Sequence, residues 1–217
     1  MVNWSQIDTV LLDMDGTLLD LHFDNYFWLE FLPQRYAAQQ GCTLPQARTF
    51  LTTLSDSLHG SLDWYCLDHW TERLAMDIEA LKYEVRHLIR FRPHTPEFLA
   101  FLQENGKQTL LVTNAHPKAL RLKLQASGLD RLLDRCISSH QFALAKENAG
   151  FWQRLQAHTG LDYEHCLFID DSLSVLRCAR AEGLGNTLQI LQPDTTLAPH
   201  PPSEFPGIMH FSELMAA

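Results

Sequence analysis

The sequence lacks any long apolar run, and no segment of its 217 residues approaches the roughly 18 consecutive apolar residues of a membrane helix. The first ten residues also lack a charged leader followed by an apolar stretch, so we expect a protein that is neither exported nor membrane-bound. Strong compositional bias is missing too, because hydrophobic residues make up 46% of the chain and charged residues 20%. These absences exclude membrane, disordered and fibrous classes, and they favour one globular domain, with or without an insert.

Positive charge is scarce. The chain has 17 lysines and arginines against 26 aspartates and glutamates, a formal net charge of −9, and it has no basic run. A nucleic-acid backbone or an anionic membrane would be repelled by most of this surface. A small ligand or a metal ion is the expected partner, and the sequence leaves the oligomeric state open.

Cysteine is also scarce, and its pattern excludes the usual cysteine-based sites. The five cysteines are odd in number, widely spaced and form no C-x-x-C pair, so neither a zinc ribbon nor a dithiol redox site is predicted. We interpret them as buried thiols of a reducing cytoplasm. The 11 histidines show no metal-ligand spacing, and none is assigned a role. The cysteines are Cys42, Cys66, Cys136, Cys166 and Cys178.

Short runs of β-branched and apolar residues are typical of buried strands. They lie at 9–12, 109–112, 135–137, 166–169 and 187–191, the third being the weakest. Helical patterns separate the later runs, and one is expected to begin with Thr95 as a hydroxyl cap and Pro96 at the first helical position. This alternation predicts an α/β fold, a Rossmann-like open parallel sheet with helices on both faces.

A helical segment interrupts this alternation between the first two predicted strands. It contains 12 of the chain's 22 aromatic residues and no convincing strand. We therefore predict a helical cap subdomain at 21–92, inserted into an α/β core formed by 1–20 and 93–217. Five prolines between Pro193 and Pro206 predict a loose surface connection near the end of the chain.

Polar residues stand directly after the predicted strands. They are Asp13 and Asp15 after the first, Thr113 and Asn114 after the second, and Asp170 and Asp171 after the fourth, with Lys146 in a loop before a helix. The carboxyl ends of parallel strands share one edge of a sheet, so these side chains are expected to converge. Because side chains alternate along a strand, Asp13 and Asp15 can face one site while Met14 points into the core.

This set of side chains suits phosphoryl transfer. Crowded carboxylates need a cation, and oxygen ligands suit Mg²⁺, which commonly bridges to a substrate phosphate. One aspartate can attack while the other moves a proton, and Thr113, Asn114 and Lys146 can hold phosphate oxygens. We therefore predict Mg²⁺ as cofactor and a phosphate monoester as substrate.

Four motifs occur in this order: DMDGT at 13–17, LLVTNA at 110–115, Lys146, and FIDDS at 168–172. With them the chain resembles the haloacid dehalogenase-like hydrolases. The resemblance implies that Asp13 is a nucleophile forming an aspartyl-phosphate, that Asp15 is the general acid/base, and that Thr113 and Lys146 bind phosphate. It also implies a metal held by Asp13, the Asp15 carbonyl and Asp171. Asp170 stands where many relatives have glycine or glutamate and is a further candidate ligand.

A narrower resemblance concerns the segments HFDNYFW at 22–28, WYCLD at 64–68 and LVTNAHP at 111–117, and Lys146-Glu147 in place of the common Lys-Pro. They are similar to the bacterial GMP/IMP nucleotidase branch, which implies a purine nucleoside monophosphate as substrate. The insert lies where this superfamily has a cap that closes over the site. Of the cap aromatics, Trp64 and Tyr65 are the candidates for touching a base, and the others are expected to pack.

Other functions stay open at this point. A sugar-phosphate phosphatase or a phosphomutase of the same superfamily would carry the same motifs, because the sequence does not show how tightly the cap excludes water. A phospho-acceptor signalling module or a silent binding protein is a different class. A receiver has its acidic pair at the first strand and needs no long helical insert, so the Asp13-x-Asp15 spacing and the late acidic pair argue against it. Dehalogenation needs no proton donor, so Asp15 favours a phosphate substrate.

Overall fold

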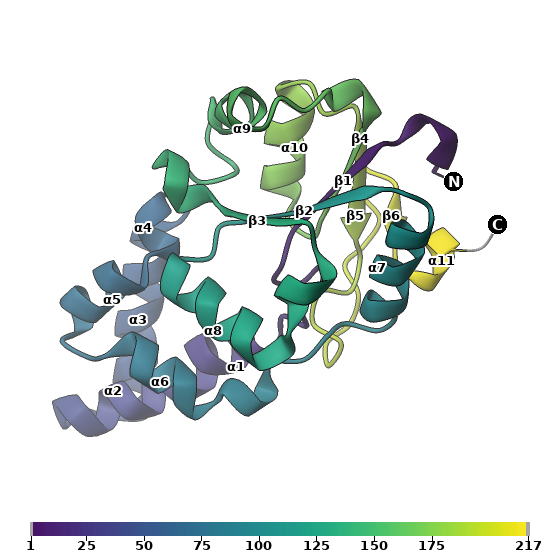
Figure 1. The fold of residues 1–217 in the computed structure, drawn as a ribbon. Coiled ribbons are helices and arrows are strands. Elements are labelled where there is room, and N and C mark those ends of the chain that lie inside the picture. The colour runs from purple at the N-terminus through teal and green to yellow at the C-terminus, as the bar shows by residue number, and fades with distance from the viewer. Residues whose placement is uncertain (1, 216–217) are drawn as a thin grey trace.

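The computed structural model describes residues 2–215, and its centre is a six-stranded parallel sheet in the order β3-β2-β1-β4-β5-β6 (Figure 1). The five predicted strands are confirmed to within about a residue at each end. The sixth strand was not predicted. The strands are β1 (Thr9–Leu12), β2 (Gln108–Thr113), β3 (Arg135–Ser138), β4 (Cys166–Asp170), β5 (Asn186–Ile190) and β6 (Gly207–Ile208).

Helices cover both faces of the sheet, as Figure 1 shows. On one face lie α9 (Phe151–Thr159) and α10 (Leu173–Ala181), and on the other α7 (Thr95–Glu104), α8 (Pro117–Ser127) and α11 (Ser212–Met215). The predicted Rossmann-like α/β fold is therefore confirmed.

The helices between β1 and β2 gather beyond one end of the sheet, and they make up the segment predicted as a cap (Figure 1). They are α1 (His22–Tyr26), the π-helical turn η2 (Phe27–Phe31), α2 (Leu32–Gln40), α3 (Leu44–Leu58), α4 (Leu62–Tyr65), α5 (Leu67–Leu74) and α6 (Ile78–Glu84). Short 3-10 turns occur at Trp4–Gln6, Arg86–Leu88, Leu129–Leu132, Ser139–Phe142 and Tyr163–His165. The division into a core of 1–20 and 93–217 and a cap of 21–92 remains a prediction, because one apolar cluster crosses it.

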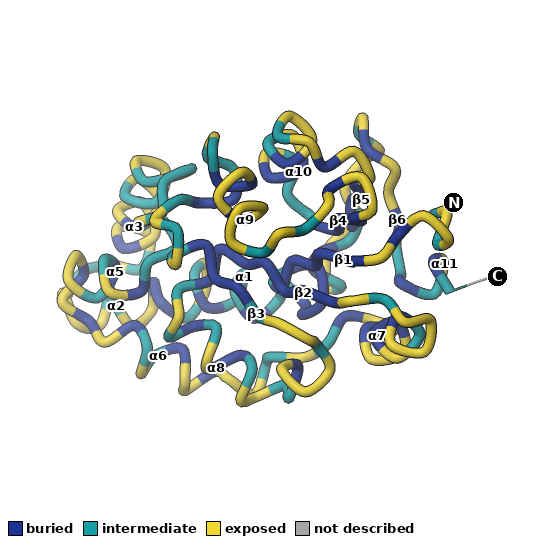
Figure 2. The backbone as a smooth tube through the Cα atoms, turned by 45° about the horizontal axis from the view of Figure 1, so that its top comes forward, coloured by how far each residue is buried: buried dark blue, intermediate teal, exposed yellow. Residues whose placement is uncertain are grey.

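Apolar side chains form two clusters, one on each face of the sheet, and the strands between them are buried (Figure 2). On the α9 and α10 face, Leu11, Val112 and Phe168 pack against Trp152. The cluster on the other face runs continuously from the sheet into the cap. Burial of apolar surface therefore holds the cap to the core as well as the sheet to its helices. Members of the second cluster include Leu12, Met14, Phe23, Phe27, Trp70 and Phe98.

The start of α7 differs from the sequence prediction. Thr95 and Pro96 do begin the helix, but the residue before it, His94, is in the left-handed conformation at φ 64° and occupies the cap position. The Thr95 hydroxyl instead donates to the Leu18 carbonyl at 3.0 Å. The predicted hydroxyl cap is therefore wrong, because this side chain joins α7 to the loop after β1.

The proline-rich segment 193–206 has no helix or strand and is largely exposed, as expected of an ordered-to-loose surface connection, and it leads into β6. Its Asp194 is nevertheless buried. Thr195 donates from its backbone to Asp20 at 3.2 Å, and its hydroxyl accepts from Arg90 at 3.0 Å. Asp20 and Arg90 lie at the two ends of the cap insertion, so this segment spans both junctions between core and cap.

Arg92 makes a second connection at the same place. Its buried guanidinium donates to the carbonyl of Thr17 at 3.2 Å, of Gln192 at 2.9 Å and of Met209 at 2.9 Å. A buried guanidinium with several carbonyl partners fixes the backbone segments that supply them. The turn after β1, the segment before α7 and the backbone at Gln192 and Met209 are thereby held together.

Two predictions about surface and thiols can be compared with the structure. Among residues 2–215, no helix has the length and apolarity needed to cross a bilayer. All five cysteines are free thiols, but only Cys166 is buried and the other four are partly exposed. The expectation of five buried thiols is therefore wrong, because Cys42 and Cys66 lie in turns before helices, Cys136 on the edge strand β3 and Cys178 on α10.

Candidate active site

The carboxyl ends of β1, β2 and β4 lie side by side and bring the predicted polar residues together. Leu12 is in register with Leu111 on one side and with Ile169 on the other. The Asp13 backbone N–H continues this ladder by donating to the Ile169 carbonyl at 3.0 Å. Met14 is fully buried among apolar residues, as the alternation of side chains predicted.

Lys146 lies at the centre of this edge. Its ammonium contacts Asp13 Oδ1 and donates to Asp170 Oδ2 at 2.7 Å and to the Val112 carbonyl at 3.0 Å. Burial alone would lower the pKa of Lys146, but Asp13 and Asp170 outweigh it and raise the pKa. All three ammonium protons are engaged, so a phosphate oxygen can reach Lys146 only by sharing or displacing one of these acceptors.

Three carboxylates surround this single lysine. One oxygen each from Asp13, Asp170 and Asp171 lies within 4.8 Å of the other two. Burial raises the pKa of Asp13 to about 6, although Lys146 opposes the shift. The pKa of Asp171 is raised well above its ordinary value by burial and by the charges of Asp170 and Asp13. We call Asp13, Asp170, Asp171 and Lys146 the Lys146 cluster; it has three acids and one base.

The loop after β1 passes very close to this cluster. Gly16 has φ 86°, and a Cβ on it would stand 2.7 Å from Asp171 Oδ2. Only glycine allows both the left-handed conformation and this approach. An excess of buried carboxylate oxygens around a tight turn fits a hard cation such as Mg²⁺, which takes oxygen ligands.

Thr113 and Asn114 differ in how they are used. The Thr113 hydroxyl accepts from the Ala115 N–H at 3.0 Å and keeps its own proton to donate. Asn114 accepts from the Lys146 N–H at 2.8 Å and donates to Glu147 Oε2 at 2.8 Å. Thr113 is thus available to a phosphate oxygen, whereas the Asn114 amide holds the Lys146 loop against β2.

Asp15 has a partner that the sequence did not reveal. Lys123 of α8 contacts Asp15 Oδ1 at 2.6 Å and Asp24 Oδ2 at 2.6 Å, and Lys82 of α6 reaches Asp24 Oδ1 at 2.8 Å. Burial raises the pKa of Asp15 to about 6 although Lys123 opposes it. We call Asp15, Asp24, Lys82 and Lys123 the Lys123 cluster; it has two acids and two bases and runs from the core into the cap.

Cap aromatics surround the far end of this cluster. The Lys82 ammonium lies 4.4 Å from the centre of the Phe27 ring, 4.9 Å from that of Phe23 and 5.1 Å from that of Trp28. Aromatic faces stabilise a desolvated cation. Part of the aromatic excess of the cap therefore stabilises a buried lysine. Helical spacing could have shown both lysines, since each stands four residues after a buried apolar residue, Ile78 or Ala119.

Trp64 and Tyr65 point to different surroundings. The Trp64 indole donates to Ser55 within the cap at 2.8 Å and packs on the cap's apolar cluster. Tyr65 donates its hydroxyl to Glu147 Oε1 at 2.7 Å, and the other oxygen of Glu147 binds Asn114. Tyr65 therefore faces the loop of Lys146, and Trp64 supports it with an edge-on ring contact of 4.8 Å.

Comparison with known proteins places this site in a family. A profile of the haloacid dehalogenase-like hydrolases matches residues 7–183, which is most of the chain. The chain belongs to the haloacid dehalogenase-like hydrolases. The GMP/IMP nucleotidases YrfG of Escherichia coli (strain K12) and Shigella flexneri are each 40% identical to it over 214 residues, 99% of this chain and 96% of theirs.

The fold comparison agrees with this membership. The solved structure of a HAD phosphatase from Thermococcus onnurineus has a TM-score of 0.79 at 22% identity and covers 96% of both chains. At that identity the likeness shows the fold alone. The predicted resemblance to the hydrolase family and to its nucleotidase branch is confirmed. The chain is an enzyme, a phosphatase-type hydrolase of that family.

Proposed function

We propose that this enzyme hydrolyses purine nucleoside monophosphates, GMP and IMP above all, in a Mg²⁺-dependent reaction that passes through an aspartyl-phosphate, an acyl phosphate of Asp13. The observation that carries the chemistry is the Lys146 cluster, where three carboxylates and one ammonium lie at the ends of β1 and β4. The similarity to the YrfG nucleotidases over nearly the whole chain supports the substrate class.

In this proposal Asp13 and Asp15 have separate roles. A carboxylate oxygen of Asp13 attacks phosphorus while the bond to the nucleoside oxygen breaks, and Asp15 gives that oxygen a proton. Asp15 then takes a proton from the water that hydrolyses the acyl phosphate. A carboxyl group whose pKa is about 6 suits proton transfer near neutral pH.

The remaining residues bind and position. Thr113 and Lys146 hold phosphate oxygens, and Asn114 fixes the backbone of Lys146. Asp13, the Asp15 carbonyl and Asp171 would hold Mg²⁺, which when bound neutralises the acids and draws charge from the phosphate oxygens. Asp170 uses one oxygen on Lys146 and the other on the Ser172 N–H at 2.8 Å, so we assign it the orientation of Lys146 and the β4 loop.

Substrate choice belongs to the cap in this proposal. The phosphate site is the same for every monoester, whereas Tyr65 reaches the edge of the site from the cap. A purine stacked on an aromatic ring gains roughly 1–3 kcal/mol, enough for a preference of about tenfold or more over a sugar phosphate. The partners are then small molecules and not nucleic acids, and the free thiols support a cytoplasmic location.

A panel of phosphate monoesters, assayed with Mg²⁺ and with excess chelator, tests the proposal. GMP and IMP should be hydrolysed in preference to pyrimidine nucleotides and sugar phosphates, and chelation should abolish the reaction. Asp13→Asn should lose turnover by about a thousandfold or more while folding normally, because an amide cannot form an acyl phosphate. Activity within tenfold of the unaltered enzyme, with deamidation excluded, would refute the covalent route.

The same panel tests the cap residues. Tyr65→Ala should weaken the preference for GMP over ribose 5-phosphate and spare hydrolysis of a small generic phosphate. Trp64→Phe is the aromatic control, because it keeps a ring at this position while removing the indole N–H that donates to Ser55. An unchanged preference in folded Tyr65→Ala would refute the role of Tyr65, and equal turnover of sugar phosphates and GMP would refute the nucleotidase assignment.

A further inference from the structure

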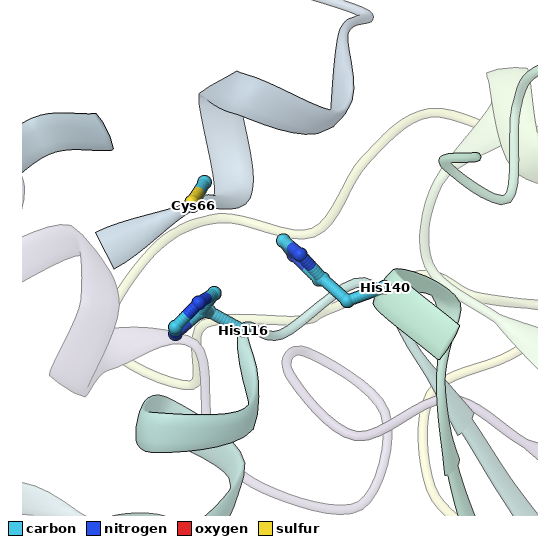
Figure 3. A group of neighbouring side chains, drawn as sticks. All are labelled: Cys66, His116 and His140. Carbon is cyan, nitrogen blue, oxygen red and sulfur yellow. The ribbon is translucent and has the colours of Figure 1, made fainter. Parts of the chain in front are cut away.

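Three metal-ligating side chains meet where the cap touches the core, outside the Lys146 cluster. Cys66 lies before α5 in the cap, His116 before α8, and His140 in the 3-10 turn after β3. One donor atom from each lies within 4.8 Å of the other two. Figure 3 shows the three side chains converging from three separate elements.

The His140 ring is held in a way that leaves one nitrogen unused. Its Nε2 is buried and makes no hydrogen bond within the part of the chain that the structure describes, residues 2–215. A buried nitrogen without a partner is costly, so this nitrogen is available to a ligand.

The other two donors are also accessible. The Nδ1 of His116 accepts a long hydrogen bond from the Lys118 N–H at 3.4 Å, and its Nε2 lies 3.7 Å from Asp68 Oδ2. Both contacts are weak, so either nitrogen can turn to a metal. The Cys66 thiol is free, and its backbone is fixed by the bond from its N–H to the Asp63 carbonyl at 3.1 Å.

From this convergence we propose a second metal site, in which Cys66, His116 and His140 bind Zn²⁺ or a similar transition metal. One thiolate and two imidazoles are soft and borderline donors, which zinc takes in tetrahedral sites, with water or Asp68 as a fourth ligand. Magnesium prefers oxygen and would not compete here.

Such a metal would join the two parts of the enzyme. Cys66 comes from the cap, whereas both histidines come from loops of the core. Cys66 meets the two histidines through the packing of the cap on the core, so metal binding favours this arrangement of the two parts. Where nucleotide hydrolysis, as proposed above, requires the cap to move away from the core, bound zinc slows the enzyme.

Cobalt provides the test, because Co²⁺ bound to a thiolate has a charge-transfer band in the near ultraviolet that an all-oxygen site cannot produce. Reduced enzyme in excess Mg²⁺ should bind one Co²⁺ with this band, and one equivalent of Zn²⁺ should remove it. Cys66→Ser should lose the band, whereas Cys178→Ser, which alters another partly exposed free thiol on α10, should keep it. No band in the unaltered enzyme, or a band that persists in Cys66→Ser, overturns the site.

A second measurement keeps the test valid if Cys66→Ser does not fold. His140→Gln and His116→Asn, each made singly, should weaken Co²⁺ binding by about tenfold or more. Unchanged affinity in both also overturns the proposal. Inhibition of GMP hydrolysis by Zn²⁺ in excess Mg²⁺, relieved in Cys66→Ser, tests the closure of the cap separately, and its failure leaves the Co²⁺ result to decide the site itself.

Discussion

The Lys146 cluster and the Lys123 cluster are both buried and lie two residues apart along the β1 loop, yet their charges differ. The first has three carboxylates around one ammonium, and the second has two of each. Burying unpaired charge is expensive, so the first cluster needs a cation from outside and the second does not. An excess of buried negative charge thus indicates where the protein binds a cation, whereas buried charges that are paired indicate where the core and the cap bind each other.

The largest expected effect comes from removing one negative charge from the Lys146 cluster. Asp171→Asn should lower turnover by about a thousandfold, because the metal loses a ligand, and it should raise the melting temperature of the metal-free enzyme, because repulsion with Asp13 and Asp170 is relieved. Kinetics with varied Mg²⁺ and thermal melting in chelator measure both. A variant that melts lower without metal would show that the three acids do not repel one another.

Removing one positive charge from the Lys123 cluster should have a smaller effect on activity. Lys123→Met leaves Asp15 without its partner and should reduce kcat for GMP by about 10–100-fold, with less loss for a phenolic ester, which departs without a proton. Loss of one partner from a buried pair also destabilises by about 3–5 kcal/mol.

The matched control for Lys123→Met is Lys118→Met on the same helix, since Lys118 pairs with exposed Asp68 at 2.6 Å and should tolerate the change. Adding Asp24→Asn to Lys123→Met removes one acid as well and should recover stability without recovering kcat. Equal losses of kcat on both substrates would mean that Lys123 maintains the fold and does not orient Asp15.

The smallest effect concerns pH. The folded enzyme raises the pKa of Asp13 from 3.8 to about 6, so in metal-free protein the stability linked to this proton is complete below about pH 4 and lost as the pH rises to about 6. For Asp24 the Lys123 and Lys82 ammoniums outweigh burial and lower the pKa to about 2, so its contribution is present above about pH 4 and lost as the pH falls toward 2.

Urea unfolding across this range, in chelator, separates the two acids. Asp13→Asn should reduce the fall in the free energy of unfolding between pH 4 and 6, and Asp24→Asn should reduce its rise between pH 2 and 4. Each change should be about 2–3 kcal/mol. The pKa of Asp15 is raised like that of Asp13, so part of the fall in the free energy of unfolding should remain in Asp13→Asn. If Asp13→Asn instead reduced the rise and Asp24→Asn the fall, the comparison of the two clusters would be wrong.

The sequence was informative wherever local pattern and chemistry coincide. Buried strands such as β1 and β4 are continuous apolar runs, and the aspartates that follow them must meet at one edge of a parallel sheet. β6 has only two residues, one of them glycine, and offers no such pattern. The sequence prediction overestimated the burial of the thiols. Free cysteine is often buried, but nothing in the spacing of these cysteines requires burial.

The partners of the site residues were harder to find. Lys123 and Lys82 occupy the apolar faces of their helices, a place where a lysine is expected only with buried acids beside it. Cys66, His116 and His140 are separated by tens of residues, and the packing of the cap on the core brings them together. Contacts that depend on the relative position of two subdomains cannot be predicted from the spacing of residues along the sequence.

The guanidinium of Arg92 has a consequence for how the enzyme is made. Every proposed residue of chemistry has been synthesised once the ribosome reaches Asp171, yet two of the carbonyls that hold Arg92 belong to Gln192 and Met209. These two contacts are therefore added to the cap junction only after the residues of chemistry have been made. A nascent enzyme thus has its reactive groups before the junction of its cap is complete.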